Sequence, residues 1–317
     1  MAKTRIRSLL AAGLVCLFAA PGPAQYMGEA NSGLVTGSHY APDWDAVCAA
    51  GTALGQGCAA IRARAVADPA LMPWRAIGRV NFASTQIRSH CTGTLVGERL
   101  VVTAAHCLYN PFRNSWIPAG SIRFAAGYRQ GAYAAVAEVE SYLLGPDLAA
   151  QAEAAEPTED WVLLTLKTPI GREIGYVEIA GGTDAADPEA WVFAGYAGLR
   201  PHVLSLAEDC GAPRTAFAKR LLVFGCAVMQ GDSGGPVLAL RDGEMVLEGL
   251  VTGVFQAGEE IVTGAVPAAS IAGAVQAARG GDPVAPAGDA PAGNAAAPAP
   301  DPGTEALTQF PPPKTGR

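Results

Sequence analysis

Short apolar runs broken by turn residues fill the middle of the 317-residue chain, from about residue 65 to residue 280. Gly, Pro, Asp or Asn separates one run from the next. The runs are 76–82, 99–104, 121–127, 161–166, 191–197, 221–227, 236–240 and 245–255. Many short β-type runs between frequent turn signals are typical of a barrel or a sandwich, so we predict an all-β domain over residues 65–280.

The two ends of the chain have different patterns. Residues 267–280 predict one helix, because Pro267 suits a first turn and Gly280 suits a stop. Residues 281–317 are dominated by Pro, Ala and Gly and have little to bury, which predicts a disordered tail. Residues 25–64 show no clear period, and we interpret them as an N-terminal extension.

The first 24 residues resemble a secretory signal peptide. Lys3, Arg5 and Arg7 precede the apolar run 9–20, and small residues follow as far as Ala24. The run is too short to span a bilayer, and no later segment is a better candidate. We therefore expect cleavage after Ala24 and a secreted or periplasmic protein with no stable membrane span.

Charge and cysteine content narrow the partners and the chemistry. The formal net charge is −7, which repels phosphate backbones and argues against nucleic acid as a partner. Outside the signal, the cysteines are Cys48, Cys58, Cys91, Cys107, Cys210 and Cys226. An even number in an exported chain favours disulfides over metal ligation, so we expect neither a metal site nor a cofactor.

The stretch "GDSGGP" places Ser233 on a tight turn. Gly231, Gly234 and Gly235 let the backbone turn sharply and approach a ligand closely. An ordinary polar hairpin turn is the alternative interpretation. A serine hydroxyl is a weak nucleophile without a positioned base, so a catalytic interpretation also requires a histidine and an orienting acid.

His106 is the candidate base among the histidines His39, His90, His106 and His202. It ends the stretch "VVTAAHC", directly after a strongly apolar run. Taken together, "VVTAAHC" and "GDSGGP" resemble the trypsin/chymotrypsin-like serine proteases, over about residues 70–280. The similarity is greatest to the bacterial secreted branch that includes glutamyl endopeptidases.

This resemblance implies a chymotrypsin-like fold of two six-stranded antiparallel β-barrels, with a boundary near 170–188 and a C-terminal helix. It also implies the disulfides Cys91–Cys107 and Cys210–Cys226, which leaves Cys48 to pair with Cys58. Sequence alone allows other connectivities.

The family uses an aspartate between the histidine and the serine, and Asp160 fits that place. It directly precedes the apolar run "WVLLTL", and "DWVLL" matches the family's pattern. A carboxylate at the start of a buried strand is desolvated and needs a partner, which a histidine N–H can supply. The weaker candidates are Asp147, Glu159, Asp184, Asp187 and Asp209. A strand-edge acid that keeps the sheet soluble is the alternative role for Asp160.

Site roles follow from the resemblance. Ser233 is the nucleophile, His106 the general base and Asp160 its orienting acid, and the backbone N–H groups of Gly231 and Ser233 bind the oxyanion. The specificity pocket would include Ala227, Val228 and Val254. No acid stands at position 227 and no histidine in 249–255, so we predict cleavage beside an uncharged, apolar side chain.

Asp232 leads to an activation hypothesis. In many family members this aspartate pairs with an N-terminal ammonium that zymogen cleavage releases. The usual Arg-Ile-Val-Gly-Gly signature is absent here. Residues 25–64 are therefore a candidate pro-segment, with Arg62 and Arg64 as candidate cut sites.

We predict a monomeric, secreted serine endopeptidase that cleaves polypeptides through an acyl-enzyme. One alternative is a protease-fold binding protein without activity. Another is an esterase or acyl hydrolase that uses the same triad; the order His, Asp, Ser argues against the α/β-hydrolase version, which runs Ser, Asp, His.

Overall fold

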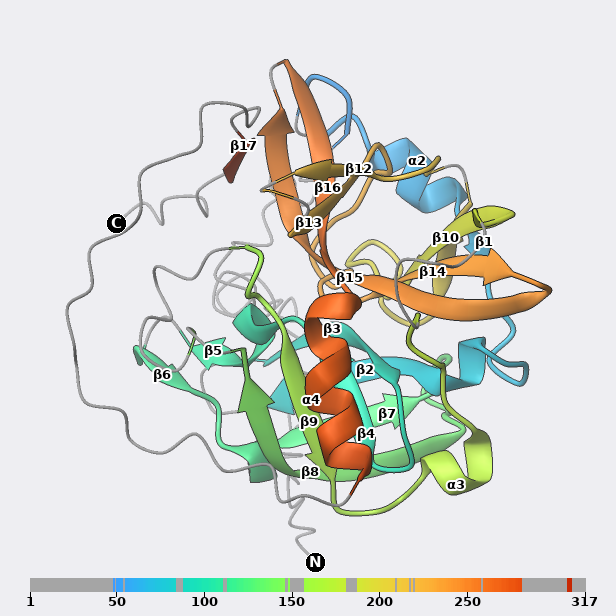
Figure 1. The fold of residues 1–317 in the computed structure, drawn as a ribbon, viewed down its shortest axis with the longest axis vertical. Coiled ribbons are helices and arrows are strands. Elements are labelled where there is room, and N and C mark those ends of the chain that lie inside the picture. Colours follow the sequence, from blue (N-terminus) through green and yellow to red (C-terminus); the bar gives the residue numbers. More distant parts are fainter. Residues whose placement is uncertain are drawn as a thin grey trace, which may run out of the picture.

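The computed structural model describes residues 48, 50–53, 55–83, 88–110, 113–145, 148, 157–180, 187–208, 210–216, 218, 220–257, 259–280 and 307–309. The predicted signal peptide 1–24 and nearly all of the predicted tail lie outside these residues. Figure 1 shows two β-rich halves: one runs from β2 to β9 and is coloured cyan to green, and the other is mainly yellow to orange and includes the blue α2 and β1.

The first half is a closed antiparallel barrel in the order β2-β3-β4-β9-β8-β7. Its strands are β2 (Ile77–Ala83), β3 (Arg88–Leu95), β4 (Leu100–Thr103), β7 (Ile122–Ala126), β8 (Ala135–Leu144) and β9 (Val162–Leu166). Val80, Phe124 and Leu164 are fully buried inside it. Short elements precede, connect or follow these strands: η1 (Trp74–Ala76), η2 (Ala105–Leu108), β5 (Tyr109–Asn110), β6 (Ser115–Trp116), η3 (Ala119–Ser121) and α3 (Gly171–Ile174).

The second half is a nine-stranded sheet in the order β1-β11-β10-β14-β15-β16-β13-β12, with β17 paired to β15. Its strands are β1 (Ala65–Val66), β10 (Ala190–Gly195), β11 (Ser205–Ala207), β12 (Arg214–Ala216), β13 (Leu221–Phe224), β14 (Pro236–Arg241), β15 (Glu244–Ala257), β16 (Glu260–Pro267) and β17 (Leu307–Gln309). Six consecutive strands of this sheet, β11, β10, β14, β15, β16 and β13, correspond to the second predicted barrel. The prediction of a mostly β, chymotrypsin-like fold is confirmed.

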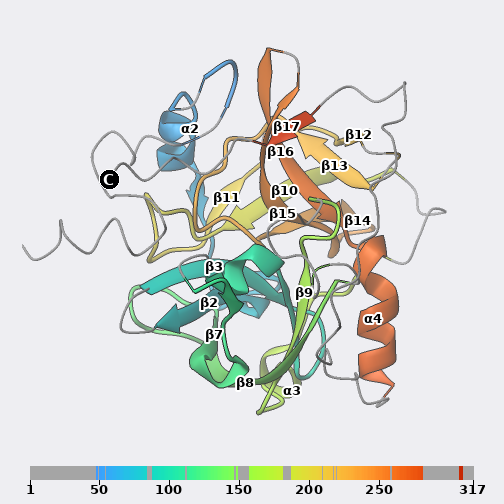
Figure 2. The ribbon, with the colours of Figure 1, turned by 90° about the vertical axis from the view of Figure 1, so that its left-hand side faces the viewer.

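The predicted C-terminal helix is α4 (Ala269–Arg279). Pro267 ends β16 instead of opening the helix, and Gly280 is the C-cap as expected. Ile271 and Val275, one turn apart, are buried. Arg279 Nε donates to Val96 O at 3.0 Å. The helix therefore follows the second half in sequence but packs beside the first barrel, as Figures 1 and 2 show.

The described part of the N-terminal extension belongs to the second half. Its helix α2 (Cys58–Ala63) leads into β1, which pairs with β11. In the predicted tail, Leu307–Gln309 forms β17, which pairs with Phe255–Ala257 of β15. For residues 307–309 the prediction of disorder is therefore wrong. Within the described ranges, no helix is long and apolar enough to cross a bilayer.

Candidate active site

His106 lies on η2, immediately after β4. The disulfide between Cys91 on β3 and Cys107 fixes this short helix to the barrel. The imidazole is half-exposed, with 47% of its side-chain surface accessible. The short helix η2 thus presents a histidine to solvent at the edge of the barrel.

Asp160 binds His106 at two points. Its Oδ2 accepts a hydrogen bond from the ring Nδ1 at 2.6 Å, and its Oδ1 accepts one from the backbone N–H of His106 at 2.8 Å. β9 starts two residues after Asp160 and pairs with β4, with Thr103 opposite Val162. That register brings the start of β9 beside the end of β4, which explains why the two residues meet.

Thr252 gives Asp160 a third hydrogen bond, from its Oγ1 to Oδ2. Both residues are buried, so a lone carboxylate here would be costly to ionise. Desolvation raises the pKa of Asp160, but the charge of His106 and the hydrogen bonds from His106 and Thr252 outweigh it, so the net pKa is lowered. An ionised carboxylate can only accept, so Nδ1 of His106 carries the proton.

The carboxylate in turn changes the pKa of His106. Desolvation lowers this pKa, but the charge and hydrogen bond of Asp160 have the greater effect. The net pKa of His106 is therefore raised above its ordinary value. Because Nδ1 is engaged with Asp160, Nε2 is the nitrogen that can accept a proton from a nucleophile.

Ser233 lies on the loop 225–235 between β13 and β14, called the Ser233 loop, which is anchored to both halves. The N–H of Thr92, next to Cys91, donates to Ser233 O at 2.9 Å, and the N–H of Gly234 donates to Val251 O at 2.7 Å. A Cβ on Gly234 would lie 2.6 Å from the backbone N of Ala104, two residues before His106. These contacts place Ser233 in the same neighbourhood as His106 and Thr252.

Gly231 makes the sharp turn that the sequence predicts. Its φ is +94°, in the region that favours glycine, and its carbonyl accepts a hydrogen bond from Thr92 Oγ1 at 2.8 Å. Asp232 closes the turn, because its N–H donates to Met229 O at 3.0 Å and its Oδ2 accepts from the N–H of Met229 at 3.0 Å. The backbone around Ser233 is therefore fixed before any ligand arrives.

Comparison with known families accounts for this geometry. Residues 68–274 match the family model described as Trypsin. The chain belongs to the trypsin family. It is therefore a serine-type endopeptidase, and the family acts on polypeptides.

Solved structures support the same fold for this trypsin-family chain. A Glu endopeptidase in complex with MPD matches at 20% identity with a TM-score of 0.53, covering 68% of this chain and 95% of that one. The thermostable serine protease AL20, from an extremophilic microorganism, matches at 18% identity with a TM-score of 0.52, covering 67% and 98%. No curated protein matches the sequence significantly.

The sequence did not indicate three residues of this candidate site. Thr92 and Thr252 make the hydrogen bonds described above. Arg64, predicted only as a cut site, forms an ion pair with Asp232 at 3.0 Å. Each is a common residue type whose partner is distant in the chain, so no local signal marks it.

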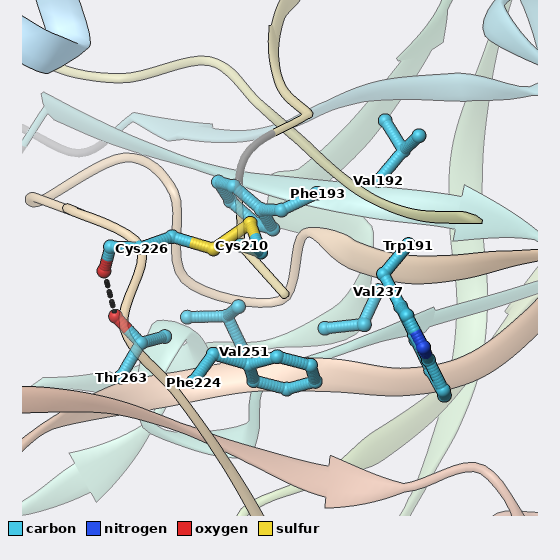
Figure 3. A pocket seen from close by; sticks show the side chains of 9 residues that line it. All are labelled: Trp191, Val192, Phe193, Cys210, Phe224, Cys226, Val237, Val251 and Thr263. Carbon is cyan, nitrogen blue, oxygen red and sulfur yellow. Dashed lines mark hydrogen bonds between the residues drawn. A yellow bond between two sulfur atoms is a disulfide. The ribbon is translucent and has the colours of Figure 1, made fainter. Parts of the chain in front are cut away.

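The predicted specificity residues fall into two groups. Ala227 packs with Cys48, Cys58 and Ile61 of the N-terminal extension. Val228 and Val254 instead contact the apolar cluster inside the second half. That cluster lines a tight apolar pocket. The Cys210–Cys226 disulfide is part of the pocket wall, beside Phe193, Phe224 and Val251 (Figure 3). The assignment of the three residues to substrate specificity stays a prediction.

The three predicted disulfides are confirmed: Cys48–Cys58, Cys91–Cys107 and Cys210–Cys226. Cys91, His106 and Cys107 lie close enough together to suggest a metal site. However, the two sulfurs are bonded to each other and are not free thiolates. This cluster positions the histidine.

Proposed function

We propose that this chain is an exported endopeptidase that cleaves peptide bonds through Ser233, His106 and Asp160, with an acyl-enzyme intermediate. The observation that carries the proposal is the double hydrogen bond of Asp160 to His106 beside the anchored Ser233 loop. Such a dyad fixes the tautomer and the orientation that a serine nucleophile requires.

The chemistry follows from that arrangement. Ser233 Oγ attacks the scissile carbonyl carbon, while Nε2 of His106 takes the hydroxyl proton. The resulting imidazolium is stabilised by Asp160 and then gives the proton to the leaving amine. Water repeats the sequence on the acyl-enzyme and releases Ser233. The backbone N–H groups of Gly231 and Ser233 stabilise the oxyanion, at about 3 kcal/mol per donor.

The substrate is proposed to be a polypeptide with an uncharged, apolar side chain before the cut, recognised near Ala227, Val228 and Val254. A secreted or periplasmic location is supported by the disulfides, which persist in oxidising compartments. We propose a monomer.

The proposal is tested by peptide cleavage. Purified protein is incubated with a peptide library, and the new termini are identified by mass spectrometry, with Ser233→Ala as the control. We expect cuts after apolar residues by the wild type alone. A clear preference for Arg or Glu would refute the specificity. Equal cutting by both proteins would refute the role of Ser233, and ester hydrolysis without peptide cleavage would identify an acyl hydrolase.

A further inference from the structure

Asp232, next to the proposed nucleophile, is fully buried and bound by one cation. The guanidinium of Arg64 donates from Nη1 to Oδ1 and from Nη2 to Oδ2, each at 3.0 Å. This is the planar two-point contact that a guanidinium makes with a carboxylate and that an ammonium cannot make. Only 3% of the Arg64 side-chain surface is exposed.

The same guanidinium also reaches the other end of the loop. Nη2 donates to Ala227 O at 2.6 Å, and the ring of Phe193 lies 5.0 Å from Cζ. The carboxylate of Asp232 accepts a hydrogen bond from the N–H of Met229, so the Arg64–Asp232 pair connects the backbone at 227, 229 and 232. The position of the N–H groups proposed to bind the oxyanion therefore depends on Arg64.

Arg64 is itself fixed by the backbone on both sides. α2 ends just before it, and β1, Ala65–Val66, pairs with β11 just after it. On the N-terminal side, the Cys48–Cys58 disulfide and Ile61 pack against Ala227 and Ala197. The extension thus delivers a cation to the loop as part of the folded chain.

We propose that Arg64 is a positioning residue that holds the Ser233 loop in its active form in the uncut chain, so that no cleavage within 25–64 is needed for activity. This inference rests on the proposed function. Without Arg64, the carboxylate of Asp232 would be buried and unpaired, which is strongly unfavourable. The loop would then turn Asp232 toward water and carry the N–H of Ser233 away from the oxyanion.

Cuts after Arg62 and after Arg64 differ in whether Arg64 stays in the chain that carries Ser233. A cut after Arg64 requires a protease to bind a buried side chain, and it leaves the cation on a separate fragment. Arg62 is exposed, and a cut after it leaves Arg64 attached to β1. Only loss of Arg64 itself should therefore remove activity.

The first experiment uses wild-type protein. It is labelled with a fluorophosphonate, and the N-terminus of the labelled molecules is read by mass spectrometry. We expect labelled molecules that begin at Gln25 and contain Arg64 in the same chain as Ser233. Labelling confined to molecules that begin at Ala63 would overturn the claim that no cut is needed. Labelled molecules that begin at Ala65 or later would overturn the inference and leave the proposed function standing. No labelling with or without limited proteolysis would refute both.

The second experiment compares Arg64→Ala with the matched control Arg62→Ala. For Arg64→Ala we expect kcat per folded molecule to fall about 10²-fold, the scale of losing one oxyanion donor. Arg62→Ala should keep the wild-type kcat, and Arg64→Lys should lie between. Thermal unfolding measured alongside separates a loss of kcat from a loss of folded protein. A wild-type kcat for folded Arg64→Ala would overturn the inference, and if that variant does not fold, the first experiment decides.

Discussion

The carboxylate of Asp160 accepts hydrogen bonds from the ring and from the backbone of the same residue, His106, at 2.6 and 2.8 Å. The backbone bond fixes η2 and the ring bond fixes the tautomer. Thr252, on β15 of the other half, donates to the same carboxylate. The acid therefore joins the two halves of the molecule at the proposed catalytic centre.

Asp160→Asn is expected to lower kcat by about 10⁴, because an amide holds the wrong tautomer of His106 and cannot stabilise the imidazolium. Steady-state kinetics on one peptide substrate measures this. Asp187→Asn, at an exposed acid, is the control and should keep the wild-type rate. A loss below about tenfold for Asp160→Asn would mean that another acid fills the role.

On the acidic side of the pH profile, kcat/KM should rise with a midpoint above the ordinary pKa of histidine, which is about 6.5. His106 acts as a base only when neutral, and Asp160 raises its pKa, so activity should increase as pH rises through that raised value. In Asp160→Asn the charge is lost, and the midpoint for the residual activity should move to lower pH. A midpoint that stays in place would contradict the coupling.

His90 should make the protein less stable in acid. Its Nε2 lies 2.9 Å from Tyr196 O, and burial, then Arg79 and His202, lower its pKa to about 4. The folded state excludes a proton that the unfolded state binds near pH 6.5. Stability from this group is therefore present above about pH 6.5 and decreases toward pH 4, by about 3 kcal/mol in total.

Denaturant unfolding of wild type and His90→Gln at pH 7, 5.5 and 4.5 tests this effect. The amide of Gln can still donate to Tyr196 O but does not titrate in this range. The stability of the variant should depend less on pH than that of the wild type. If the unfolding free energies of the two proteins changed with pH by the same amount, His90 would not be the cause of the acid sensitivity.

Gly234→Ala should destabilise the protein by about 3 kcal/mol or more, because strain and overlap act together. Gly234 has φ +73°, and an added Cβ would lie 2.1 Å from Thr103 Oγ1. Gly243 has φ +80° but open space around the same position, so Gly243→Ala is a control for strain alone, about 1–2 kcal/mol. An equal loss of stability for the two variants in thermal unfolding would show that overlap with Thr103 Oγ1 and the nearby backbone of Thr92 and Ala104 adds nothing to the strain.

The sequence predicted the parts of the fold whose apolar runs are unbroken. β9 and β14 coincide with such runs, and α4 with the one helical pattern. β8 was missed because Glu138 and Glu140 interrupt its apolar positions. Glu138 turns out to face Arg123 and Lys167 on the barrel surface, where acids are compatible with a strand.

The contact between His106 and Asp160 was predictable, because each residue stands in a motif beside a strand, His106 after β4 and Asp160 before β9. Arg64 was not, because 168 positions separate it from Asp232 and only the packing of the extension brings them together. Nothing in the residues around Arg64 distinguishes it from the exposed Arg62.

We propose that Ser233 is an activated nucleophile and that its activation depends on His106. The most direct measurement is fluorophosphonate labelling of wild type, Ser233→Ala and His106→Ala, with the labelled peptide located by mass spectrometry. We predict a label on Ser233 in the wild type and none on either variant. A label at another residue, or equal labelling of His106→Ala, would contradict the account.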